Sequence, residues 1–81
     1  MRAARRSVGL KNRFSKDKLL GSKWTALHPM QKEKHFIVLD WDPKAPEQRE
    51  KVLVEAVLTR RERLVPVSEL RNCKDWRMGW H

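Results

Sequence analysis

Four tryptophans in a chain of 81 residues are the side chains whose chemistry stands out most. An indole face can stack on a nucleobase, with a gain of about 1–3 kcal/mol per base, while nearby lysines and arginines hold the phosphates. Lys23 next to Trp24 and Arg77 next to Trp76 pair a cation with a ring in this way. Trp24 and Trp80 are our candidates for stacking. The structural alternative is that the rings fill a small core, because one aromatic side chain can bury about 150–250 Å².

Basic side chains are concentrated at the N-terminus. Residues 1–18 hold seven basic residues against one acid, a net charge of +6 out of the +9 of the whole chain. Such a field attracts polyanions, so nucleic acid is the first candidate partner, and an anionic membrane surface or an acidic protein is the second. A solvated tail or a targeting segment would have the same composition. The candidate phosphate contacts are Arg2, Arg5, Arg6, Lys11, Arg13, Lys16, Lys18, Lys23, Arg60 and Arg61.

The remaining reactive side chains do not converge on a catalytic or metal site. His28, His35, Cys73 and His81 show none of the paired spacings of a structural zinc site. Nothing near Cys73 supplies the base that a thiol nucleophile needs. The three glycines are isolated, so there is no phosphate-binding loop. We therefore expect no enzymatic activity, no metal and no cofactor.

Length and cysteine content restrict the class of protein further. A chain of 81 residues holds at most one small domain. It has no apolar run of about 18 residues, so we expect no membrane span. A single cysteine cannot form an internal disulfide, which suits a reducing compartment, and we expect a cytoplasmic location.

Apolar periodicity predicts the elements that must position these side chains. We expect an edge strand ended by Pro66, a helical turn capped by Ser68, and a C-terminal tail folded back onto the sheet. The alternation places Ile37, Leu39 and Trp41 on one face, in the core. The predicted strands are 24–27, 35–41, 51–59 and 62–65, the helical turn is 68–72, and the tail is 76–80.

Short antiparallel strands of this kind predict a mostly β fold. We expect a small SH3-like barrel or a curled sheet of three or four strands with one short helical turn. The composition changes near residue 19. It predicts a flexible basic arm over residues 1–17 and a tryptophan-rich β domain over residues 18–81.

Several short motifs carry a family resemblance. They are Leu20-Gly21-Ser22-Lys23-Trp24-Thr25-Ala26, Glu33-Lys34-His35-Phe36, Leu53-Val54-Glu55-Ala56-Val57, Leu70, Trp76 and Gly79-Trp80. Together they resemble the small tryptophan-rich conserved hypothetical proteins of bacteria, over about residues 18–81. The resemblance implies one compact domain with no assigned activity or cofactor, and it supplies no catalytic residue.

These observations favour a non-enzymatic, accessory binding module. The preferred partner is RNA or a ribonucleoprotein, bound mainly through charge, with sequence-independent contacts to phosphates. The alternative is a protein–protein interaction module in which the tryptophans line a groove for an extended peptide. The sequence does not separate RNA from DNA.

Overall fold

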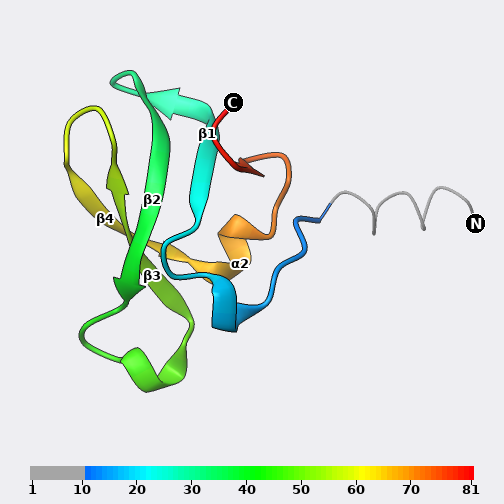
Figure 1. The fold of residues 1–81 in the computed structure, drawn as a ribbon, viewed down its shortest axis with the longest axis vertical. Helices are drawn as coiled ribbons and strands as arrows, with labels where there is room; N and C mark the ends of the chain where they lie inside the picture. Colours follow the sequence, from blue (N-terminus) through cyan, green and yellow to red (C-terminus); the bar gives the residue numbers. More distant parts are fainter. Residues whose placement is uncertain (1–10) are drawn as a thin grey trace, which may run out of the picture.

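The computed structural model describes residues 11–81, in which one antiparallel sheet is packed against a short helix (Figure 1). The mostly β prediction is confirmed. In chain order the elements are η1 (Lys16–Lys18), β1 (Lys23–Met30), β2 (Glu33–Trp41), η2 (Pro46–Gln48), β3 (Lys51–Ala56), β4 (Glu62–Pro66), α2 (Val67–Leu70) and β5 (Trp76–Met78), where η marks a 3-10 turn.

The strands follow the order β4-β3-β2-β1-β5, and every neighbouring pair is antiparallel. The described residues thus form five strands, where the sequence predicts three or four. The sheet is not closed into a barrel, so β4 and β5 are its two edges. The fifth strand is the C-terminal tail, which folds back as predicted and pairs with β1 from Trp24↔Met78 to Ala26↔Trp76.

Both hairpin turns, β1–β2 and β3–β4, hold residues in the left-handed region of backbone space. Gln31 and Lys32 join β1 to β2 with φ values of 56° and 64°. Positive φ at both central residues makes a two-residue turn follow the twist of its strands. Between β3 and β4, Arg60 has φ of 65°, and β3 ends at Ala56 rather than at the predicted Thr59.

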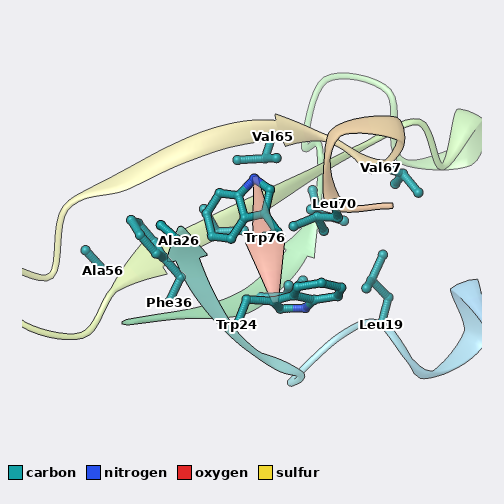
Figure 2. Packing of buried hydrophobic residues seen from close by; sticks show 12 residues of the cluster. Leu19, Trp24, Ala26, Phe36, Ala56, Val65, Val67, Leu70 and Trp76 are labelled. Atoms are coloured by element: carbon teal, nitrogen blue, oxygen red, sulfur yellow. The ribbon is translucent and has the colours of Figure 1, made fainter. Parts of the chain in front are cut away.

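The core lies on one face of the sheet and follows the alternation of β3. Val52, Val54 and Ala56 of β3 are fully buried. Figure 2 shows the ring of Trp76 between Val65 of β4 and Trp24 of β1, so the sheet curls around this ring. The full set of buried apolar residues is Leu19, Trp24, Ala26, Phe36, Val38, Val52, Val54, Ala56, Val65, Val67, Leu70 and Trp76.

A bulge in β2 changes which residues face the core. The register with β3 slips by one residue between Val38 and Asp40. One inserted residue moves the following side chains to the other face of the sheet. Leu39 stays on the outer face with Ile37 and is exposed. Trp41 is moved to the inner face, where it packs against the core and is partly buried. The prediction that Ile37, Leu39 and Trp41 share one core face is wrong.

The helix begins one residue earlier than predicted, and Ser68 does not cap it. Its N-cap is Pro66, with φ of −63° and ψ of 141°, and no side chain caps the first turn. Proline fits this position because its fixed φ directs the chain out of the edge strand and into the helix. Val67 and Leu70 of the helix cover the open side of the core.

Residues 11–17 contact the domain rather than lying apart from it. The side-chain amide of Asn12 donates hydrogen bonds to the carbonyls of Leu70 and Trp76, both at 2.8 Å. The ring of Phe14 meets Trp24 edge-on, with 5.5 Å between ring centroids. The expected boundary between residues 17 and 18 does not match these contacts. Arg2, Arg5 and Arg6 lie outside the described residues.

Candidate functional site

The four tryptophans, all within the described residues, differ in their access to solvent. Trp24 and Trp76 are 1% and 2% exposed, Trp41 is partly buried, and Trp80 is 41% exposed. The indole N–H of Trp24 donates to the Ser22 hydroxyl at 2.8 Å inside the domain. Trp24 therefore cannot stack on a base, contrary to the sequence prediction, whereas Trp80 offers an accessible ring.

Trp80 lies on the outer face of the sheet, opposite the core. Its indole N–H donates to the backbone carbonyl of Phe36 at 2.9 Å. The Lys23 ammonium lies 4.8 Å from the centre of the indole ring, and the His35 imidazole is tilted by 38° to it at 5.9 Å. This cluster of Trp80, Lys23 and His35, which we call the Trp80 site, unites one ring and one permanent cation on a sheet face. A ring held in this way is suited to stacking and an adjacent ammonium to a phosphate.

Backbone and hydroxyl groups fix the tail that carries Trp80. Gly79 has φ of 85°, and its N–H donates to the Lys23 carbonyl at 2.7 Å. The Thr25 hydroxyl donates to the Gly79 carbonyl at 2.7 Å and accepts the His81 N–H at 2.9 Å. Thr25 is 1% exposed, so the tail covers it fully. The position of the indole is therefore set before any ligand binds.

The other candidate phosphate contacts are dispersed over the domain. Lys23 belongs to the Trp80 site, Lys11 forms a bridge with Asn72 beside the helix, and Arg61 lies directly before β4. Arg77 pairs with Thr25 across β1–β5, which places it on the same sheet face as Trp80. Among the described candidates, Lys16 is half-buried, and the exposed ones are Lys11, Arg13, Lys18, Lys23, Arg60 and Arg61.

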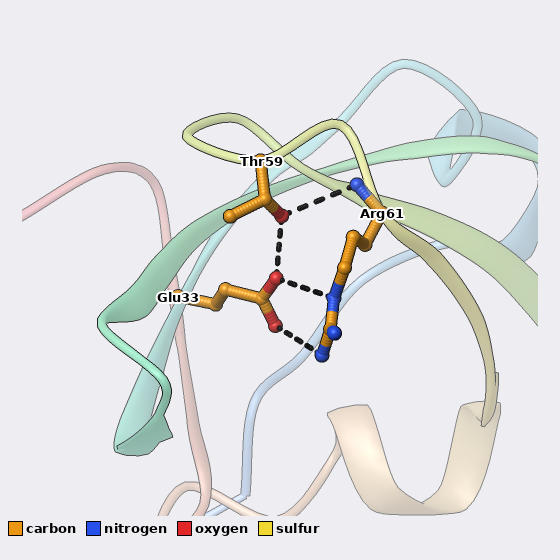
Figure 3. A network of polar contacts seen from close by, with 3 residues as sticks. All are labelled: Glu33, Thr59 and Arg61. Atoms are coloured by element: carbon orange, nitrogen blue, oxygen red, sulfur yellow. Dashed lines mark hydrogen bonds and ion pairs between the residues drawn. The ribbon is translucent and has the colours of Figure 1, made fainter.

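Arg61 is held in a network of polar contacts that joins the turn end of the β1–β2 hairpin to the turn end of the β3–β4 hairpin (Figure 3). Its Nε donates to the Glu33 carboxylate at 2.9 Å, and the Thr59 hydroxyl donates to the same carboxylate. The bond from Thr59, together with the bonds and positive charge of Arg61, lowers the pKa of Glu33, while desolvation opposes the change. Arg61 therefore joins two hairpins and is less available to phosphate than the sequence suggests.

A groove of about 430 Å³ opens on the core side, next to this network. Phe36 and Trp76 contact each other edge-on at its base, with 5.3 Å between centroids. The Arg63 guanidinium lies over both rings, 5.2 Å and 5.5 Å from their centres. Opposite, Glu69 accepts the indole N–H of Trp76 at 2.8 Å, and Asp75 completes an acidic wall. Sequence reasoning missed this groove because its residues come from the β1–β2 hairpin, the beginning of the β4 segment and the α2–β5 region, which are far apart in the chain.

The comparisons with known proteins agree with the sequence resemblance. The sequence model of the family described as Tryptophan-rich protein (DUF2389) matches residues 22–81. The chain belongs to this family. No curated protein and no solved structure matches the chain. Membership of this family of unknown function confirms the predicted resemblance and assigns no activity.

Metal-ligand clusters and long apolar helices are both absent from the described residues. No group of three or more His, Cys, Asp or Glu side chains within residues 11–81 is placed to hold a metal ion. No helix in this part of the chain is long and apolar enough to cross a membrane.

Proposed function

We propose that this tryptophan-rich protein is a non-enzymatic module that binds single-stranded RNA, alone or in a ribonucleoprotein, through the Trp80 site. The observation that carries the proposal is an indole that is 41% exposed, fixed on a sheet face, with the Lys23 ammonium 4.8 Å from its ring centre. In this proposal one base stacks on Trp80, and Lys23 and Arg77 contact the flanking phosphates.

The charge of the chain supports this choice of ligand. A net charge of +9 favours association with any polyanion and makes it depend on salt. Arg2, Arg5 and Arg6 would add phosphate contacts that carry no sequence information. Stacking and charge together give binding that tolerates many sequences, which is the mode of proteins that bind single strands without base readout.

Titration of a labelled oligouridine by fluorescence anisotropy tests the proposal. Trp80→Ala should weaken binding about 5- to 150-fold, the equivalent of one stacked base. Trp41→Phe is the matched control, because Trp41 packs against the core and should leave binding unchanged. Lys23→Gln should reduce the slope of log affinity against log salt by about 0.7. Equal affinity of Trp80→Ala and the unaltered chain would refute stacking at this site.

The protein-interaction alternative concerns another surface. Trp80 does not line the groove on the core side, whereas Trp76 does. Phe36, Trp76 and Arg63 give that groove an aromatic base and a cation, so it is a site separate from the Trp80 site.

A further inference from the structure

The open side of the sheet leaves a gap beside the edge strand β4. β5 pairs with β1 only from Trp24 to Ala26, so residues 28–30 of β1 have no strand on that side among the described residues. The groove occupies this position, between the end of β1 and β4. A second hollow of about 310 Å³, lined by Glu62 and Arg63 among others, continues along β4. The two hollows together form a seam, a trough that runs beside the edge strand.

The outer edge of β4 offers backbone groups to this seam. The Ala56 N–H donates to the Arg61 carbonyl at 2.8 Å. This bond identifies Arg61, Arg63 and Val65 as the positions whose backbone groups point toward β3. Bonded and non-bonded positions alternate in an antiparallel ladder. The N–H and C=O groups of Glu62 and Leu64 therefore point away from β3, toward the open edge. An added strand could pair with these four groups.

The charges of the seam favour a protein segment over nucleic acid. Three acids and two arginines line the groove, and Arg61 is already paired with Glu33. The remaining charges are Arg63 on one wall and the carboxylates of Glu69 and Asp75 on the other. Phosphates would meet an excess of negative charge here. A segment that carries one acidic and one basic side chain would match both walls.

The guanidinium of Arg63 is positioned to bind a carboxylate. Its guanidinium carbon lies 5.2 Å and 5.5 Å from the centres of the Phe36 and Trp76 rings, and the group forms no ion pair within residues 11–81. A planar guanidinium has in-plane N–H donors that can bind a carboxylate through two parallel hydrogen bonds. Met30, 74% exposed at the end of β1, adds a flexible apolar contact.

We propose that the seam binds an extended segment of a partner protein as an added β-strand. The main chain of the segment pairs with Glu62 and Leu64. Alternate side chains enter the groove, where an acidic one meets Arg63 and a basic one meets Glu69 and Asp75. Binding here uses a different face from the Trp80 site and does not depend on the proposed RNA contact.

Selection of a random nonapeptide library on the full chain supplies the probe, and anisotropy of the enriched, labelled peptide measures its affinity. The critical pair of variants is Leu64→Pro and Leu64→Ala. Proline removes the outward N–H, which β3 does not use, and edge strands tolerate it. Alanine keeps the N–H and removes the same side chain, which lies on the outer face. Leu64→Pro should weaken binding at least about tenfold, and Leu64→Ala by less than about threefold.

A second pair of variants tests the charges. Arg63→Gln should weaken an acidic peptide about tenfold, whereas Arg60→Gln, at the exposed turn, should have no effect. Trp80→Ala should leave peptide binding unchanged, which separates this proposal from the RNA contact. The proposal is overturned if no peptide is enriched, or if Leu64→Pro binds the peptide as tightly as Leu64→Ala.

Discussion

Replacing Trp24 and Trp41 in turn by alanine tests whether Trp24 is a fully buried core residue and Trp41 a partly buried residue at the margin of the core. Trp24 is 1% exposed, and its loss removes a large ring, the hydrogen bond to Ser22 and the edge-on contact with Phe14. A buried aromatic replaced by alanine costs about 3–5 kcal/mol. A chain of this size has a total stability of about 4–12 kcal/mol. Trp24→Ala should therefore remove a large part of the free energy of unfolding.

Trp41 gives the contrasting case, because it is only partly buried and Arg49 covers its ring at 4.9 Å. We expect Trp41→Ala to cost about 1–2 kcal/mol, since surrounding water replaces part of the lost contact. That corresponds to a fall in Tm of about 4–16 °C. Thermal and urea unfolding followed by circular dichroism measure both variants. An equal loss of stability in the two, or a Trp24→Ala melt within a few degrees of the unaltered chain, would refute the assignment.

Two further predictions concern the N-terminal segment and the hairpin ends. Asn12→Ala should lower Tm by about 4–16 °C, because it leaves the carbonyls of Leu70 and Trp76 without their donor at a cost of about 1–2 kcal/mol; an unchanged melt would mean that residues 11–17 do not hold the domain together. Because Thr59 and Arg61 lower the pKa of Glu33 in the folded state, its contribution to stability is present above its unfolded pKa and is lost as pH falls through the folded value. Unfolding measured from pH 7 to pH 2 should therefore show a weaker acid dependence in Glu33→Gln, and identical pH profiles would contradict the network.

The alternation of apolar and polar residues predicts the buried side chains correctly where the strand pairing is regular. Val52, Val54 and Ala56 alternate with polar or half-buried residues, and all three are buried as the pattern predicts. The same rule fails in β2, because a bulge adds one residue without any glycine or proline to mark it. Strict alternation places Leu39 and Trp41 on one face, whereas the bulge leaves Leu39 exposed and turns Trp41 toward the core. A bulge is defined by how β2 pairs with β3, so the alternation of apolar residues within β2 alone does not reveal it.

The N-terminal contacts and the groove depend on residues far apart in the chain. Asn12 donates to carbonyls that are 58 and 64 positions away in the sequence. Because no local pattern indicates these bonds, the sequence alone assigns residues 11–17 to a charged arm. Arg63 and Trp76 meet only because the sheet curls and its last strand returns to β1. Charge and composition identify which residue types are available to a ligand. The strand order decides which of these residues share a surface, and the pattern of a single sequence does not reveal the strand order.

Phe36 shows how one residue of the β1–β2 hairpin positions both proposed surfaces. Its ring forms the base of the groove under Arg63, and its carbonyl accepts the indole N–H of Trp80 on the opposite face. Side chains and backbone groups of a strand point in different directions, so one rigid pair of strands can serve two ligands without sharing contacts. The Trp80 site carries a cation beside an exposed ring, whereas the groove carries more acids than bases. Opposite charge on the two faces is the physical reason to assign RNA to one and a protein segment to the other.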